Sequence, residues 1–308
     1  MISAASTDSQ RAARVLIIFP GSLGDFLLLV PAAAALVHRG RQVELSVQRA
    51  LQGLAGRLLP GPAGPAVDGA AMSSLFTATP APAIAAWLRG ADLVHSWLGA
   101  TGAATALEGR RRELGVGALH HHAVERTDAP VHASAAYAAA LGVGCPLRMP
   151  LFALDSGERA DWWRAPSAAR LLIHPGAGSA EKRWSASGFR LLADRWGAAG
   201  GEVTILLGPA EEDMAEFWRA AGHRVAAGLD ILDAAARIVS APRYLGNDSG
   251  VSHLAGALGR TGVVLFGPTR PERWRPLGGA LVPVRFTSDS IAELAAALLD
   301  RLRRMHSA

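Results

Sequence analysis

The stretch "RYLGNDSGVSHLAGALG", residues 243–259, joins a short apolar run to an Ala/Leu-rich periodic run through four small polar residues or glycine. This order predicts a strand, a turn and a helix. Oxygens of Asp248 and Ser249 would cap the helix, and Gly250 would let an anion approach its amino end. Capping alone explains only one residue of the string, so the stretch also indicates an anion site. His253 would lie one turn into the helix, facing that site or packed inside.

The same order of strand, glycine-containing turn and helix recurs on both sides of this stretch. "ARLLIHPGAGS" (169–179), "EVTILLG" (202–208) and "TGVVLFGPT" (261–269) predict further strands in the second half. In the first half, "RVLIIFP" (14–20) is followed by a helical pattern over 24–40 and by "QVELSV". Such alternation is typical of an α/β protein with parallel, doubly wound sheets.

The length of 308 residues favours two domains. A change to proline-rich, aperiodic sequence over 145–166 indicates the linker. We therefore predict two Rossmann-like domains, over 1–155 and 156–308. The amphipathic helix at 290–305 closes the second domain or packs back on the first. Residues 120–141 are predicted to be helical, with an interruption at Pro130.

The charge and cysteine content exclude several classes of protein. The 31 Lys and Arg against 26 Asp and Glu give a net charge of +5 without a basic tract, so nucleic-acid binding is not expected. The single cysteine, Cys145, excludes an intramolecular disulfide and a multi-cysteine metal site. The N-terminal residues lack the apolar core of a signal peptide, and no apolar run is long enough to span a bilayer. We expect a cytoplasmic protein.

The segment "HPGAGSAEKRW" (174–184) is a second candidate anion site. Its glycines free the backbone to bend around a phosphate, and a hydroxyl and an ammonium stand beside them. The residues concerned are Gly176, Gly178, Ser179 and Lys182. The segment is neither a Walker A loop nor GxGxxG, and a simple turn is the alternative. Two such loops in one sheet suggest a diphosphate bound between strand ends.

Three further groups carry a functional and a plain structural interpretation. Asp25, in "FPGSLGDF" (19–26), would project from a helix start as a general base, or would only cap that helix. A glutamate in "AEEDM" (210–214) would contact a ribose or cap its own helix. The histidines of "HHH" (120–122) favour a solvated helix start over a metal site, because adjacent side chains point in different directions.

Three segments together resemble the signature regions of family 9 glycosyltransferases, the ADP-heptose:lipopolysaccharide heptosyltransferases. They are "GSLGDFLLLVPAAAAL", "HPGAGSAEKRWSASGFRLLADRW" and "GNDSGVSHLAGALGRTGVVLFGPTRPERWRP". The resemblance implies a glycosyltransferase-B fold, with two domains facing a cleft, an acceptor on the first domain, a nucleotide-sugar on the second, and no metal or other cofactor. Departures at Pro20-Gly21 and Leu29-Val30 lie on the acceptor side.

The resemblance also implies roles for individual residues. Asp25 matches the general base and Lys182 the lysine that holds the donor phosphate. Glu212 is the better match to the ribose-binding glutamate, with Glu211 as the alternative. The remaining donor-binding residues would be Gly176, Gly178, Ser179, Leu229, Asp248, Ser249, Gly250 and His253.

The function implied is sugar transfer with inversion, with heptose from ADP-heptose as the donor. The acceptor would be a lipopolysaccharide core, or a related lipid-linked or oligosaccharide acceptor. A lipid-linked acceptor would bring the protein into peripheral contact with the inner face of the membrane. The alternatives are a nucleotide-sugar epimerase-like enzyme on the same fold and a non-catalytic nucleotide-sugar-binding protein.

Overall fold

The computed structural model describes residues 12–99, 102–123, 131–144, 149, 169–287 and 290–305. Contacts divide the chain into two compact units. The first comprises Met1–Pro20, Ala33–Arg49 and Gly61–Val124, and the second Gly21–Ala32, Ala50–Pro60 and Glu125–Ala308. The predicted boundary at 155, most of the predicted linker and Cys145 lie outside the described residues. The two units are not separated by one boundary in the sequence, because two N-terminal segments group with the second unit.

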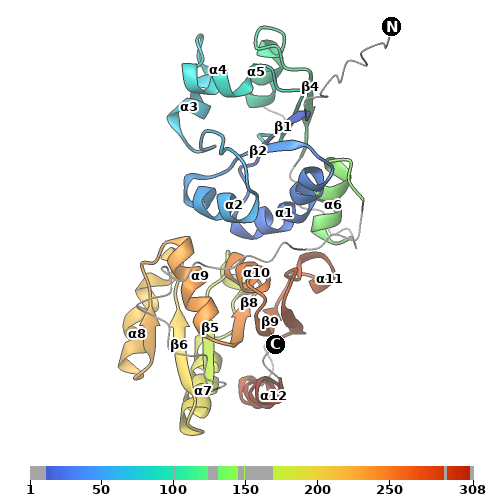
Figure 1. Ribbon diagram of the computed structural model, residues 1–308. Coiled ribbons are helices and arrows are strands. Elements are labelled where there is room, and N and C mark those ends of the chain that lie inside the picture. Colours follow the sequence, from blue (N-terminus) through green and yellow to red (C-terminus); the bar gives the residue numbers. More distant parts are fainter. Residues whose placement is uncertain are drawn as a thin grey trace, which may run out of the picture. The chain divides into compact units, whose positions relative to one another are not determined.

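The first unit holds a parallel four-stranded sheet in the order β2-β1-β3-β4 (Figure 1). Its strands are β1 (Arg14–Ile18), β2 (Gln42–Ser46), β3 (Leu93–Ser96) and β4 (Ala118–His121). β1 is a continuous apolar run because side chains cover both faces of a parallel sheet. Leu16 and Ile18 of β1 pack in one core with Ile84 and Leu88.

The helices of the N-terminal half connect these strands and lead into the second half of the chain. They are α1 (Leu23–His38), α2 (Gln52–Leu58), α3 (Ala70–Ser73), α4 (Pro82–Leu88), α5 (Ala103–Arg110) and α6 (Ala133–Ala140), with 3-10 turns η1 (Arg49–Leu51) and η2 (Ser74–Phe76). Within the described ranges, no helix combines the length and the apolar character needed to cross a membrane.

The second unit contains a parallel six-stranded sheet in the order β10-β9-β8-β5-β6-β7 (Figure 1). Its strands are β5 (Arg170–His174), β6 (Glu202–Leu206), β7 (Arg224–Ala226), β8 (Arg243–Asn247), β9 (Thr261–Phe266) and β10 (Ala280–Arg285). The helices are α7 (Ala186–Ala198), α8 (Ala215–Ala220), α9 (Ile231–Ser240), α10 (Gly250–Ala257), α11 (Pro271–Trp274) and α12 (Ile291–Arg304), with 3-10 turns η4 (Ala180–Lys182) and η5 (Pro209–Met214). This strand order is that of a Rossmann sheet.

Helix α12 packs within the second unit. Its buried residues Ala295, Leu298 and Leu302 share a core with Phe189 of α7 and Leu265 of β9. From the sequence, this helix could also have packed on the first domain. In the structure its buried face contributes to the hydrophobic core of the second unit. The α/β class with two parallel, doubly wound sheets is confirmed.

The structure corrects the prediction of a helix over 120–141. Residues 118–121 form the edge strand β4, in which His120 pairs with His95 of β3. A helix begins only at Ala133, and Pro130 lies outside the described residues. The local Ala-rich and His-rich composition is compatible with a helix, but pairing with β3 outweighs this weak preference.

Candidate functional site

The two predicted anion-binding loops follow neighbouring strands at the point where the strand order of the second sheet reverses. From β5 the chain proceeds to β6 and β7 in one direction, and β8 then pairs on the other side of β5. The loop at 174–184 follows β5, and residues 247–250 follow β8. Ligands of open α/β sheets bind outside the carboxyl ends of the strands at such a reversal. This edge of the second sheet is therefore the candidate site.

Asn247 joins these two loops. Its side chain is fully buried; Oδ1 accepts a hydrogen bond from the backbone N–H of Trp184 at 3.0 Å, and Nδ2 donates to the carbonyl of Pro175 at 2.8 Å. A planar amide suits this task because it carries a donor and an acceptor side by side. Asn247 thus fixes the glycine-rich loop against the end of β8, a role that sequence reasoning did not assign.

Helix α10 begins at Gly250, three residues after this asparagine. Ser249 is its N-cap residue, and the Ser249 hydroxyl accepts a hydrogen bond from the backbone N–H of Ser252 at 3.3 Å. Helix capping therefore accounts for Ser249 but not for Asp248. The free N–H groups and the dipole at the start of this helix favour an anion beside Ser249 and Gly250.

Asp248 lies at the centre of a small, partly buried hydrogen-bond network. Its carboxylate is 5 % exposed, and Oδ2 accepts hydrogen bonds from Nζ of Lys182 at 3.1 Å and from the hydroxyl of Thr269 at 2.7 Å. The structure thus brings together Lys182 and Asp248, which the sequence separates by 66 positions. Lys182 is also the only lysine among the 31 Lys and Arg of the chain. Thr269 was not predicted, because only the folded sheet places the loop after β9 beside Asp248.

The glycine-rich loop is closely approached by a glutamate. A Cβ atom built on Gly176 would lie 2.4 Å from the carboxyl carbon of Glu211, so any larger residue there would displace the Glu211 side chain. Glu211 is buried, and its charged neighbour is Nη2 of Arg183 at 3.9 Å. Glu212, the residue preferred from the sequence, is exposed. The structure places these two residues differently without testing which one binds a ligand.

The other predicted donor residues lie on loops at the same edge. Gly178 is exposed, and nothing approaches the position of a Cβ atom within 4 Å. Ser179 precedes the 3-10 turn that carries Lys182, and its side chain makes no capping bond. Leu229, half-buried, follows β7 and immediately precedes Asp230, the N-cap residue of α9.

Asp25 belongs to a segment of the second unit and lies in the first turn of α1. Oδ2 of Asp25 accepts a hydrogen bond from the Ser22 hydroxyl at 2.8 Å. The same turn contacts α10, since a Cβ atom built on Gly250 would lie 3.1 Å from the backbone nitrogen of Gly24.

His253 is packed inside, which was one of the two predicted placements. It is 4 % exposed, its Nδ1 has no hydrogen-bond partner, and a Cβ atom on Gly24 would lie 3.2 Å from its ring. Burial lowers the pKa of His253 to about 4, against the opposing effect of the charges of Asp248 and Asp25. This histidine is therefore neutral at pH 7 and supplies no positive charge to a bound anion.

The predicted histidine cluster lies in the first unit, away from these loops in the sequence. Nδ1 of His95 and Nε2 of His122 share a hydrogen bond of 2.9 Å, and the His122 ring packs against Trp97 with ring centroids 4.3 Å apart. Burial, and then the charge of His122, lowers the pKa of His95 to about 4. Among the residues that the structure describes, no group of three His, Cys, Asp or Glu side chains could hold a metal ion.

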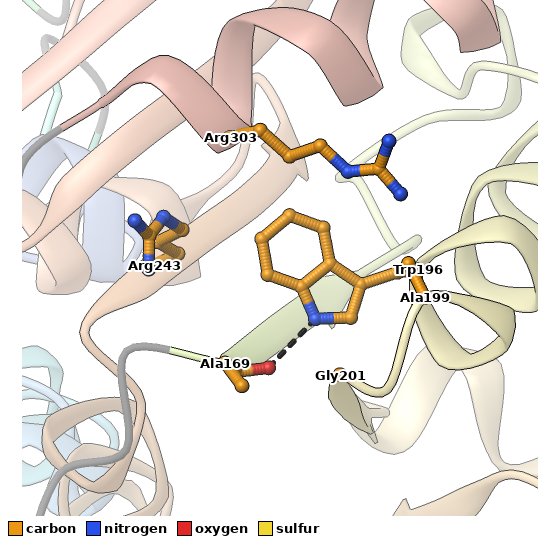
Figure 2. Close-up of a pocket in the computed structure, with 6 residues that line it drawn as sticks. All are labelled: Ala169, Trp196, Ala199, Gly201, Arg243 and Arg303. Atoms are coloured by element: carbon orange, nitrogen blue, oxygen red, sulfur yellow. Dashed lines mark hydrogen bonds between the residues drawn. The ribbon is translucent and has the colours of Figure 1, made fainter.

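A separate small pocket lies at the opposite ends of the strands of the second sheet (Figure 2). It is lined by Ala169, Trp196, Ala199, Gly201, Arg243 and Arg303. Polar groups of its lining already make hydrogen bonds within the protein. Nε1 of Trp196 donates to the carbonyl of Ala169 at 2.7 Å, and Arg243 donates to the carbonyl of Leu302 at the end of α12. Because ligands of such sheets bind at the carboxyl ends, this pocket is not the candidate site.

Comparison with known proteins agrees with the geometry. Residues 82–295 match the model of glycosyltransferase family 9 (heptosyltransferase). The lipopolysaccharide heptosyltransferase 1 of Pseudomonas aeruginosa is 34% identical over 153 residues, which are 49% of this chain and 41% of the relative. The match thus spans less than half of that relative's length.

Two solved structures share the fold over nearly all of both chains. The ADP-heptose lipopolysaccharide heptosyltransferase II of E. coli has a TM-score of 0.75 at 18% identity and covers 94% of this chain and 97% of its own. The E. coli heptosyltransferase WaaC with ADP has a TM-score of 0.69 at 18% identity, covering 94% and 98%.

Proposed function

The chain belongs to glycosyltransferase family 9, and from this premise we propose that it transfers heptose from ADP-heptose to a hydroxyl group of a lipopolysaccharide-core or related acceptor. The transfer proceeds with inversion and without a metal ion. The observation that carries the proposal is the pair of Lys182 and Asp248 at the reversal of the second sheet, beside the amino end of α10.

In this proposal the diphosphate of the donor lies between the glycine-rich loop and the start of α10. As the bond to the sugar breaks, negative charge grows on the leaving nucleoside diphosphate. The ammonium of Lys182 and the free N–H groups at Ser249 and Gly250 stabilise that charge more in the transition state than in the ground state. These groups do electrostatically what a bound metal does in other transferases.

A lysine suits this position better than an arginine would. Its compact ammonium carries three donors on a flexible stem, so it can contact Asp248 and a phosphate oxygen together or move from one to the other. All other cationic side chains outside histidine are arginines. The sole lysine of the chain thus lies where a mobile point charge is useful.

The acceptor hydroxyl loses its proton to Asp25 as it attacks the sugar. This carboxylate lies in the first turn of α1, where the helix dipole favours a negative charge. Attack from the face opposite the leaving diphosphate gives inversion.

Panel titration with a matched variant tests the donor site. We expect the wild-type protein, in EDTA, to bind ADP and ADP-heptose more tightly than the UDP, GDP and CDP counterparts. Lys182→Met should weaken ADP binding about ten- to a hundredfold, the effect of losing a charge-assisted hydrogen bond. Calorimetry measures the nucleotide preference of the wild type and the ADP affinity of the variant.

Arg190→Met is the matched control, because it also removes one positive charge and Arg190 lies on α7 paired with Asp194. Equal ADP affinity of wild type and Lys182→Met would contradict the diphosphate clamp. Absence of binding to every nucleotide of the panel would overturn the proposed function.

Glu211 is the ribose partner that we propose, with Glu212 as the alternative. Its carboxylate is buried beside Gly176 but accepts no hydrogen bond from the described residues. A buried carboxylate without donors is unfavourable, so a ribose hydroxyl that donates to it would be stabilised. Glu212 is exposed and would gain less from the same contact.

Glu211→Gln should therefore weaken ADP binding about tenfold, by removing a hydrogen bond to a charged acceptor. The same substitution should scarcely affect a nucleotide that lacks the ribose hydroxyls. Glu212→Gln is the matched control, and calorimetry with ADP and 2′,3′-dideoxy-ADP provides the comparison. The reverse pattern in the two variants would assign the ribose to Glu212.

A further inference from the structure

Thr269 lies where three loops of the second unit meet. It follows β9, whereas Lys182 and Asp248 follow β5 and β8. The loop that carries Thr269 is held in place from two sides. The backbone carbonyl of Thr269 accepts a hydrogen bond from Arg285 at 3.3 Å. A Cβ atom built on Gly267 would lie 3.1 Å from the carbonyl oxygen of Glu181. The hydroxyl of Thr269 thus reaches Asp248 from a loop with close neighbours on two sides.

Both donors to the Asp248 carboxylate end on the same oxygen. Lys182 and Thr269 donate to Oδ2, at 3.1 and 2.7 Å, and no described residue donates a hydrogen bond to Oδ1. A carboxylate oxygen can accept more than one hydrogen bond, so Oδ1 keeps its full capacity for a ligand. The hydroxyl of Thr269 thus determines which of the two oxygens is available.

The two donors differ in what a diphosphate does to them. An arriving diphosphate attracts the flexible ammonium of Lys182 away from Oδ2, whereas the hydroxyl of Thr269 is neutral and stays. Without Thr269, a buried carboxylate would then face a diphosphate with no donor of its own, which is strongly unfavourable. With Thr269, Asp248 keeps a hydrogen-bond donor after Lys182 has moved.

We propose that Thr269 is a positioning residue for the nucleotide-sugar: it holds Oδ2 of Asp248, so that Oδ1 accepts a hydrogen bond from a hydroxyl of the donor sugar while Lys182 binds the diphosphate. This inference rests on the proposed function and deepens it. It distinguishes the intact donor from the nucleoside diphosphate, because only the donor carries the sugar that Asp248 contacts.

Two substitutions at Thr269 separate the hydroxyl from the shape of the side chain. Thr269→Val keeps the volume and removes the donor, and Thr269→Ser keeps the donor. We expect Thr269→Val to bind ADP-heptose about tenfold more weakly than wild type, with a smaller loss for ADP, and Thr269→Ser to restore both affinities. Calorimetry measures the affinity for each of the two ligands, with folded variants whose melting temperatures match that of the wild type.

The single lysine provides a second readout that needs no ligand. An amine-reactive acylating reagent can label only Lys182 and the N-terminal amine, which peptide masses tell apart. In Thr269→Val the Asp248 carboxylate depends on Lys182 alone and holds the ammonium more tightly. Acylation of Lys182 should therefore be slower than in wild type, with the N-terminal amine as internal reference, and Thr269→Ser should restore its rate.

The outcomes separate this inference from the function beneath it. A wild-type protein that binds neither ADP nor ADP-heptose overturns both. A wild-type protein that binds both, with Thr269→Val unchanged or equally weakened for the two ligands, overturns only the role of Thr269. Failure of Thr269→Ser to restore binding would reduce the threonine to a packing role.

Discussion

Replacing Asp25 with asparagine is expected to lower the turnover of sugar transfer by about 10²- to 10⁴-fold. Asparagine has the same size as aspartate. Its side-chain oxygen can still accept the hydrogen bond that the Ser22 hydroxyl donates to Asp25 at 2.8 Å. It cannot accept the proton of the acceptor hydroxyl. The loops after β5 and β8 are untouched, so ADP affinity should remain that of the wild type. Initial rates and calorimetry on the same preparation measure the two quantities.

Ser22→Ala is the matched control for this substitution. It removes the hydrogen bond to Asp25 but leaves the carboxylate, so turnover should fall far less than in Asp25→Asn. Wild-type turnover in Asp25→Asn would remove Asp25 from the mechanism. Product analysis completes the test: a product that forms only with acceptor indicates transfer, whereas a rearranged nucleotide-sugar formed without acceptor indicates the epimerase-like alternative. Donor binding without turnover in the wild type would indicate a non-catalytic protein.

Most of the strands that sequence analysis identified contain a short apolar run next to a turn and a helical pattern. β1, β5 and β9 are mostly buried within parallel sheets, and each contains an uninterrupted apolar run, whereas the buried strand β8 also carries Arg243 and Asn247. The two edge strands of the second sheet gave weaker signals. β7 has three residues, and β10 carries Pro283, which an edge strand tolerates because one side of it needs no hydrogen bonds. Neither strand was predicted.

The candidate site was predictable where a residue's role is local. The string at 247–250 and the glycine-rich loop stand at strand ends, and parallel strands place their carboxyl ends at one edge. From this the proximity of Lys182 and Asp248 could be expected, and the structure contains it. Whether these residues bind a donor stays a prediction.

Roles that depend on contacts between distant loops could not be predicted. Asn247 reads as one more turn residue until the backbone of Trp184 is seen against its amide. Thr269 lies 21 positions from the carboxylate that it contacts. The choice between Glu211 and Glu212 depends on which side chain the 3-10 turn η5 directs at Gly176, and a sequence motif does not define a turn to within one residue.

The second unit should lose stability steeply as the pH falls from 7 to 5, because it contains two histidines that are neutral when folded. Burial lowers the pKa of His174 and of His253 to about 4 from 6.5. For His174 the hydrogen bond from Nδ1 to the carbonyl of Leu206, at 2.9 Å, opposes this shift without cancelling it. Both rings would have to take up a proton that their surroundings disfavour.

The sign follows from which state binds the proton. Well above pH 6.5 the histidines are neutral in both states and contribute no pH dependence. Between pH 6.5 and 4 the unfolded chain carries more protons, so the free energy of unfolding falls as the pH falls. Each histidine contributes about 2 kcal/mol of this loss between pH 7 and pH 5, and the pair about 4 kcal/mol. Urea unfolding at the two pH values measures it.

His174→Asn isolates one of the two histidines, because the asparagine Nδ2 can occupy the place of Nδ1 and donate to the carbonyl of Leu206. The variant does not titrate at this position, so its loss of stability between pH 7 and pH 5 should be about 2 kcal/mol smaller than that of wild type. Carboxylates contribute equally to both proteins and cancel in the difference. An equal loss in the two proteins would mean that His174 accepts its proton in the folded state as readily as in the unfolded chain.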